Sequence, residues 1–309
     1  EFGVSPIDEN EAGFQIRRTK LNFSGHVGSP KFTYDVVLAA DRGDGNVFLE
    51  DVVVGYNIVD GLEVEVGRKK LPFLREELIS SKRQLAVERS SVTEFFTLNR
   101  SEGIWFNWSP VEAVKIQAAL SDGGNAAPSD FHSDRTEAPS ITARIDVSLA
   151  GSLKQARDYT AWEGDPLAVV VGGALHYEAG ESGDSASVND ADQFAWTVDG
   201  SLEMFPFNVY AAFIGSHPMD VAVVDFDDPD FLTNEDFDNY GAQVQAGVHV
   251  IPNKLEPFFR FEWISVDSRT DPDSETGVDD EAILLTFGAN YYLNKHNAKF
   301  TIDVDWALD

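Results

Sequence analysis

The chain has 309 residues and a formal net charge of −30, with 53 acidic and 23 basic side chains. This balance excludes a general nucleic-acid-binding protein, because that class holds phosphate with clustered Lys and Arg. The absence of cysteine excludes a disulfide framework and a thiolate metal site. No apolar run approaches the roughly 18 residues of a membrane-spanning helix. The first residues do not resemble a basic, apolar leader, so we expect that any export signal has already been removed.

Apolar and polar residues alternate along most of the chain, which is the pattern of strands with one apolar and one polar face. Most alternating runs span about 9–13 residues, a length that suits a tilted strand crossing a hydrocarbon layer, whereas strands of ordinary globular sheets average about five or six. In chain order, the predicted strands are 14–27, 31–42, 46–57, 61–70, 100–108, 112–121, 139–150, 166–178, 192–204, 206–216, 239–251, 254–265, 281–293 and 297–308.

The connections between these strands alternate between short turns and long, acidic segments rich in Gly, Pro and Ser. This rhythm predicts a single antiparallel transmembrane β-barrel over residues 1–309, with short periplasmic turns and long extracellular loops. Two connections break the rhythm, because 43–45 is short and 151–165 is long. The long segments are 71–99, 122–138, 179–191, 217–238 and 266–280.

Two other classes of protein remain open. A soluble acidic β-sandwich that binds a ligand would also show alternating strands, and a structural barrel could display its acidic loops to a surface partner. We favour the barrel because long, uniform strands present more apolar face than a two-sheet core needs. Aromatic residues near strand ends fit interfacial girdles; they include Trp105, Trp108, Phe258 and Trp263.

Residues 68–100 hold eight of the 23 basic side chains and four acidic ones, whereas the rest of the chain carries 15 basic and 49 acidic side chains. We expect residues 70–99 to fold into the lumen and narrow it, so that their cations attract anions. Simple pairing with acids in a solvated loop is the alternative. The predicted constriction cations are Arg68, Lys69, Lys70, Arg75, Lys82, Arg83, Arg89 and Arg100, and the predicted lumen-wall cations are Lys115, Arg144 and Arg260.

The segment GRKKLPFLREELISSKRQLAVERS (67–90) resembles the signature of the phosphate- and polyphosphate-selective porins of Gram-negative outer membranes. A second segment, GFQIRRTKLNFSGHV (13–27), resembles an early strand of the same family through Arg17, Arg18 and Leu21. The matching positions of the first segment are Gly67, Lys70, Pro72, Phe73, Glu76, Glu77, Leu78, Ser80, Ser81, Glu88, Arg89 and Ser90.

The resemblance implies a homotrimer of sixteen-stranded barrels in the lipid of the bacterial outer membrane. In each barrel the third loop would fold into the lumen and guide small hydrophilic solutes, including anions such as phosphate, by passive diffusion and without catalysis.

The chain departs from that family pattern in three ways. Fourteen strands are readable, so we expect one to be missing at each end. The last residues, Ala307 to Asp309, lack the terminal aromatic residue of such barrels, so we expect the true C-terminus to lie further on. The lumen-facing positions carry no basic ladder, because acids are also found there: Asp35, Glu63, Glu65, Asp146, Asp199, Glu203, Glu262, Asp303 and Asp305.

Acidic clusters in two of the long segments are candidate Ca²⁺ sites, because hard cations prefer oxygen ligands. Neither cluster has EF-hand spacing, so solvated acidic loops are the alternative. The six histidines lack zinc-site spacing, and no other cofactor is expected. The candidate Ca²⁺ ligands are Asp225, Asp227, Asp228 and Asp230.

Overall fold

The computed structural model describes residues 19–40, 45–125, 139–180, 192–219, 221–224, 232–267 and 281–308. Among these residues, no helix has the length and apolar character needed to cross a membrane. The elements in chain order are β1 (Thr19–Val27), β2 (Ser29–Ala40), β3 (Val47–Val59), β4 (Leu62–Lys70), α1 (Arg75–Leu78), η1 (Ser81–Arg83), α2 (Ser91–Phe96), β5 (Arg100–Val111), β6 (Val114–Ser121), β7 (Ser140–Ala150), η2 (Gln155–Arg157), β8 (Ala168–Glu178), β9 (Asp192–Met204), β10 (Phe207–Met219), β11 (Val221–Val224), β12 (Leu232–Glu235), β13 (Asn239–Val248), β14 (Leu255–Ser265), β15 (Glu281–Asn294) and β16 (Ala298–Leu308).

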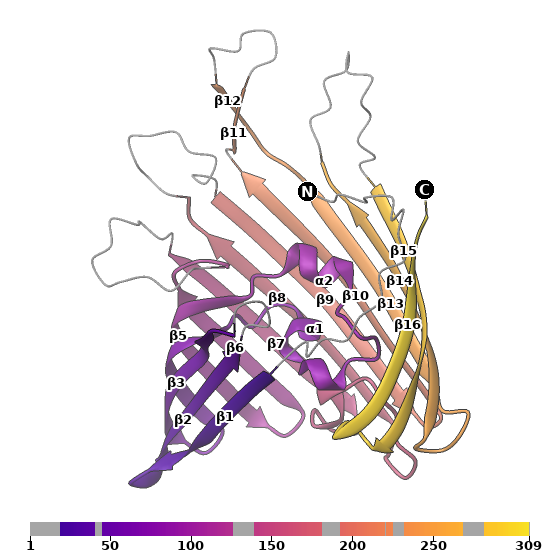
Figure 1. The fold of residues 1–309 in the computed structure, drawn as a ribbon. Helices are drawn as coiled ribbons and strands as arrows, with labels where there is room; N and C mark the ends of the chain where they lie inside the picture. The colour runs from indigo at the N-terminus through magenta and orange to yellow at the C-terminus, as the bar shows by residue number, and fades with distance from the viewer. Residues whose placement is uncertain are drawn as a thin grey trace, which may run out of the picture.

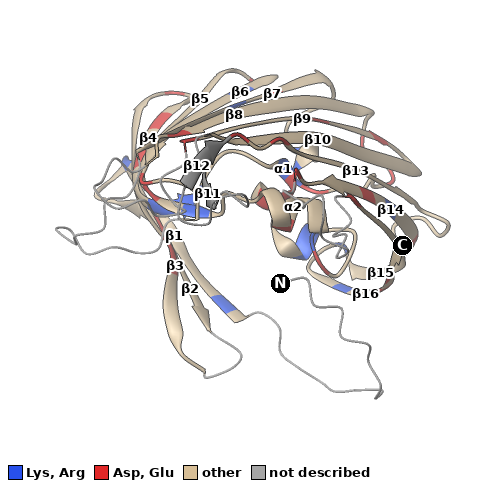
Figure 2. Cartoon of the chain, turned by 90° about the horizontal axis from the view of Figure 1, so that it is seen from above, with Lys and Arg blue, Asp and Glu red and all other residues tan. Residues whose placement is uncertain are grey.

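Fourteen of these strands form one antiparallel sheet in which each strand pairs with the next along the chain, while β11 and β12 form a separate hairpin. The sheet curves around an interior, as Figure 2 shows from above. Each of the fourteen predicted strands corresponds to one strand of this sheet, so that prediction is confirmed. Within the described residues β1 and β16 are the two edges, and the sixteen strands implied by the resemblance are not reached in this sheet.

The two faces of the sheet differ as the alternation predicts. Along β14, inward-facing Glu256, Arg260 and Glu262 are buried, whereas outward-facing Phe259 and Phe261 are only partly buried. On β16 the outward side chains Phe300 and Trp306 are 67% and 64% exposed. No second sheet covers this apolar face within the described residues, which excludes the soluble sandwich.

The connection between β4 and β5, which we call the inner loop (residues 71–99), lies inside the curve of the sheet together with α1 and α2 (Figures 1 and 2). Its apolar side chains pack against small and aliphatic residues of the inner wall and form a core inside the barrel. Trp105 of β5 is 0% exposed within this core, and Phe258 of β14 is 5% exposed in a second buried cluster, so the assignment of these two residues to an interfacial girdle is wrong. The core comprises Leu71, Phe73, Leu74, Val92, Phe96, Leu98, Trp105, Ala119, Ala174, Ala195, Ile214 and Ile264.

A glycine of the wall makes room for the inner loop. A Cβ on Gly241 of β13 would lie 2.5 Å from the ring of Phe96 and 2.9 Å from a methyl group of Val92, both on α2. Since β-carbons do not approach other carbons so closely, only glycine at this position lets α2 lie against the wall.

Candidate functional site

The inner loop is anchored to the barrel wall by the carboxylate of Glu76, which is 1% exposed. It accepts hydrogen bonds from the backbone N–H of Ser90 (3.2 Å) and from the hydroxyls of Ser90 and Thr93 (both 2.5 Å). The side-chain amide of Gln243, on β13, donates a fourth bond (2.9 Å). Buried charged groups require such partners. Through these bonds, Glu76 joins α1 to the start of α2 and to β13 on the far wall.

A second anchor lies on the opposite wall. Arg144 of β7 is 2% exposed and donates from Nη1 to the carbonyl oxygen of Phe73 (2.8 Å). Its Nη2 lies 2.7 Å from Asp199 on β9 and 2.6 Å from Asp146 on β7. Arg75 of α1 donates to Ser201 (2.8 Å) and lies 3.5 Å from Asp199. Acidic side chains and backbone carbonyl groups bind these two arginines. The arginines therefore fix the position of the inner loop.

Strands near the other edge of the sheet hold the later part of the inner loop. Arg260 of β14 donates to the carbonyl oxygen of Glu88 (3.0 Å), and Asn290 of β15 donates to that of Leu85 (2.9 Å). Glu262 accepts from the N–H groups of Ser91 (2.5 Å) and Val92 (3.3 Å), the first turn of α2, where exposed N–H groups favour an anion. The inner loop also reaches β16, where Lys299 donates to the carbonyl oxygen of Gln84 (2.5 Å), so it spans the interior from β4 to β16.

The connection between β7 and β8, which we call the inner turn (residues 151–167), also packs inside the barrel. The hydroxyl of Thr160 lies 3.2 Å from that of Tyr292, and the ring of Trp162 lies 4.8 Å from that of Tyr292. The rings of Tyr159 and Tyr210 are 4.8 Å apart, and burial raises the pKa of Tyr159 well above its usual range, which keeps its hydroxyl neutral.

The inner turn touches the inner loop. Arg75 donates to the carbonyl oxygen of Ala156 and Arg83 donates to that of Arg157, each at 3.4 Å. The two connections begin at opposite ends of the strands, since each strand is antiparallel to its neighbours. The lumen is therefore narrowed from both ends, and the two segments meet where α1 and η1 contact η2.

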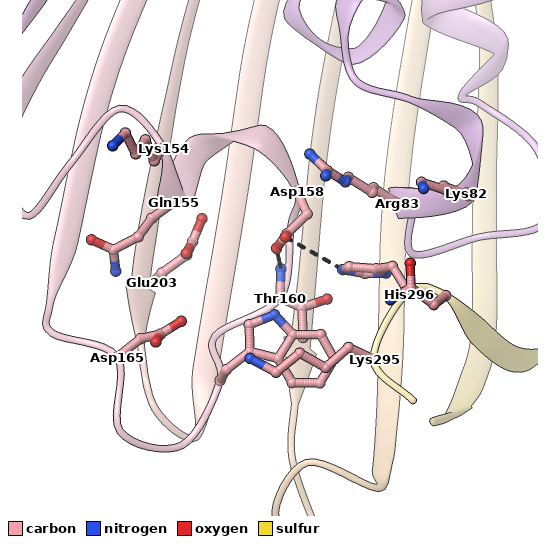
Figure 3. A pocket seen from close by; sticks show the side chains of 12 residues that line it. Lys82, Arg83, Lys154, Gln155, Asp158, Thr160, Asp165, Glu203, Lys295 and His296 are labelled. Carbon is pink, nitrogen blue, oxygen red and sulfur yellow. Dashed lines mark hydrogen bonds and ion pairs between the residues drawn. The ribbon is translucent and has the colours of Figure 1, made fainter. Parts of the chain in front are cut away.

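Three cavities follow one another along the lumen. The upper cavity, of about 490 Å³, lies beside the ends of β4 and β5. It shares Leu78 and Ser80 with the basic cavity, of about 610 Å³, which lies between the inner loop and β5–β8. The basic cavity in turn shares Arg83 and Lys154 with the end cavity, of about 310 Å³ (Figure 3). The shared residues show that neighbouring cavities adjoin one another around the two inner segments.

Charge is distributed unevenly among these three cavities. The upper cavity is lined by four basic and four acidic side chains. The basic cavity is lined by six basic and two acidic side chains: Arg75, Arg83, Lys115, Arg144, Lys154 and Arg157 against Glu112 and Asp146. The end cavity has four basic and three acidic side chains. The excess of positive charge is thus greatest just beyond the inner loop, on the side of the short turns.

The predicted constriction cations do not form one cluster. Lys70, Arg89 and Arg100 line the upper cavity, where Arg100 lies 2.6 Å from Asp51. The ammonium group of Lys70 donates to the carbonyl oxygen of Glu77 (2.6 Å). Lys69 pairs with Glu65 on the wall, so most of these cations near the strand ends are occupied by acids or carbonyl groups.

The remaining predicted cations are spread over the other positions. Arg75 and Arg83 line the basic cavity, and Lys82 and Arg83 line the end cavity. Arg68 lies opposite Glu102 in the register of β4 and β5 and lines none of the three cavities. Of the predicted wall cations, Lys115 and Arg144 line the basic cavity, whereas Arg260 is buried beneath the inner loop.

Two cations of the basic cavity were missed by the sequence-based prediction. Lys154 and Arg157 belong to the inner turn, are exposed to the lumen and form no ion pair with any residue that the structure describes. The sequence signal that could have identified them is the length of the 151–165 connection, which interrupts the regular short turns.

The candidate Ca²⁺ ligands Asp225, Asp227, Asp228 and Asp230 lie outside the described residues. Over the ranges that the structure does describe, no group of three or more His, Asp or Glu side chains is placed to hold a metal ion.

Comparisons with known proteins agree with this architecture. The family model for "Phosphate-selective porin O and P" matches residues 4–306. An uncharacterised protein of Aquifex aeolicus (strain VF5) is 24% identical over 310 residues, which is 93% of this chain and 70% of that protein.

Solved porin structures share the fold. OmpT of Vibrio cholerae, in its trimer form, superposes with a TM-score of 0.58 at 10% identity, covering 94% of this chain and 80% of OmpT. Salmonella typhi OmpF, in complex with daunomycin, superposes with a TM-score of 0.58 at 14% identity, covering 94% of this chain and 82% of OmpF. The anion-selective porin of Comamonas acidovorans superposes with a TM-score of 0.54 at 12% identity, covering 90% of this chain and 74% of that porin. With its family match over nearly the whole length, the chain belongs to the phosphate-selective porin O and P family and is an outer-membrane porin, a channel rather than an enzyme.

Proposed function

We propose that this porin favours small hydrophilic anions, with phosphate as a candidate solute, and that residues 1–309 act as a single barrel domain. The observation that carries the proposal is the excess of basic over acidic side chains around the basic cavity, six against two. Charges that line a narrow, water-filled passage with low-dielectric walls dominate the potential inside it, even when the whole chain is strongly negative.

Within the predicted set, Arg83 and Lys115 are the cations that we propose to attract permeating anions. Both line the basic cavity, and the guanidinium of Arg83 is held only by a carbonyl oxygen at 3.4 Å among the described residues. Arg75 and Arg144 line the same cavity, but Asp199 neutralises part of their charge. We therefore assign the constriction to the inner loop as a whole and the selectivity to those cations of the loop and wall that face the water of the basic cavity.

We also propose that the chain assembles as a homotrimer in the membrane. The support is the porin fold, together with the trimer form of the similar Vibrio cholerae OmpT. Sedimentation or cross-linking of the folded protein in detergent tests the assembly, and a monomer under conditions that retain channel activity would contradict it.

The reversal potential across a planar bilayer with a KCl gradient tests the proposed selectivity. Wild-type channels should be more permeable to chloride than to potassium, and Arg83→Glu together with Lys115→Glu should lower the anion/cation permeability ratio. Lys254→Glu is the control for a charge reversal elsewhere, because this exposed lysine lines none of the three cavities. A cation-selective wild type, or an effect of the double variant no larger than that of the control, would contradict the proposal.

A further inference from the structure

The inner turn is packed against the wall of the lumen and is not a loose connection. Its far part is fastened to the wall at the periplasmic end of β14 and β15 by several independent contacts. Thr160 bonds to Tyr292, and Glu163 exchanges two hydrogen bonds with Asn253 at 3.0 and 3.1 Å. The ring of Trp162, 5% exposed, packs against Tyr292.

Its near part is fastened to the inner loop. The carbonyl oxygens of Ala156 and Arg157 accept hydrogen bonds from Arg75 and Arg83. Each of these bonds uses the backbone of the inner turn and leaves its own side chains available. The turn is therefore held on both sides, which fixes where the side chains of Lys154 and Arg157 project.

Both side chains line the basic cavity of the lumen. Lys154 lines both the basic cavity and the end cavity, and the one other residue shared by these two cavities is Arg83 of the inner loop. In Figure 3, Lys154 lies on one side of the end cavity, and Lys82 and Arg83 lie on the other. A solute that passes between the cavities thus moves between a cation of the inner loop and a cation of the inner turn.

We propose that Lys154 and Arg157 are selectivity-determining residues, forming with Arg83 a second anion-attracting point on the periplasmic side of the inner loop. This inference rests on the proposed anion preference and extends it to a segment outside the 70–99 region. An anion leaving the basic cavity meets a cation pair contributed by two connections from opposite ends of the barrel. The end cavity that follows is lined by three acids, Asp158, Asp165 and Glu203, against four basic side chains, so its excess of positive charge is smaller than that of the basic cavity.

The test compares Lys154→Glu plus Arg157→Glu with the control Lys254→Glu, in the full chain, by reversal potential in a KCl gradient. All three positions are exposed, and circular dichroism checks that each variant folds. A unit charge about 4 Å from an ion in water changes the local ion concentration by roughly fivefold. Because screening reduces this effect and four charge units change in total, the anion/cation permeability ratio should fall by at least about fivefold, while the control leaves it near the wild-type value.

The possible failures can be told apart. If Arg83→Glu plus Lys115→Glu lowers the ratio but Lys154→Glu plus Arg157→Glu matches the control, this inference is overturned and the proposed function stands. If wild-type channels show no anion preference, both are overturned. A fall in the ratio with Lys154→Glu alone, relative to Lys254→Glu, would support the assignment of Lys154 to the junction between the cavities.

Discussion

Replacing Glu76 by Ala should release the inner loop from the wall. The substitution removes one acceptor group that serves four donors: the N–H and hydroxyl of Ser90, the hydroxyl of Thr93 and the amide of Gln243. Hydrogen bonds to a charged group contribute about 1.5–3 kcal/mol each, and unsatisfied buried donors add a penalty. Because bonds that share one acceptor are not additive, we expect a total loss of about 3–5 kcal/mol from the packed position of the loop.

A loss of this size changes the ratio of packed to displaced loop by roughly 10²–10⁴. Single-channel conductance should then increase and fluctuate more, and trypsin should cut the folded protein faster at Lys82 and Arg83. Glu94→Ala is the matched control, since it removes the same charge from an exposed position of α2 in the same loop. If conductance and cleavage rate are the same in Glu76→Ala and Glu94→Ala, the carboxylate of Glu76 does not anchor the loop and the reasoning fails.

Three further predictions concern the interior of the barrel. Gly241→Val should displace α2 and raise the single-channel conductance, because a Cβ at this position would lie 2.5 Å from the ring of Phe96. Gly200→Val is the control and should leave the conductance unchanged, because no neighbouring atom lies closer than 3.7 Å to a Cβ at that position. Equal conductances of the two variants would contradict the steric argument. Trp162→Ala should loosen the inner turn, because removing a buried aromatic ring costs about 3–5 kcal/mol of stability. Single-channel noise should then be higher than in the control Trp306→Ala, which removes an outward-facing ring. Equal noise in the two variants would contradict the packing of the inner turn against the wall. Burial lowers the pKa of His249, so the unfolded state binds more protons just below the ordinary histidine pKa and the free energy of unfolding should fall as pH drops through that window. Urea unfolding in detergent at successive pH values measures this fall, and an equal pH dependence in His249→Gln would refute the assignment.

The strands of the barrel could be predicted from the sequence because their signal is local. Inward and outward positions alternate with a period of two, and runs such as Leu255–Ser265 keep that period without interruption. The resulting outer face is apolar over its whole length, which lipid requires and which the sequence pattern expresses directly. The excess of basic residues in 68–100 is equally local, and it pointed to the connection that lies inside the lumen.

Which cations face water could not be predicted in this way, because it depends on residues far apart in the chain. Arg144 meets Asp199, 55 residues away, and Glu76 meets Gln243, 167 residues away. Arg144 and Arg260 have the right alternation for the lumen wall, yet Arg144 is bonded to Phe73 and Asp199, and the inner loop covers Arg260.

Lys154 carries no motif, and it lines two cavities of the lumen because the inner turn packs back into the barrel against Tyr292 and Asn253. Alternation determines the side of the wall on which a residue lies. The curvature of the sheet and the packing of the two inner segments determine which charges remain exposed to a passing ion.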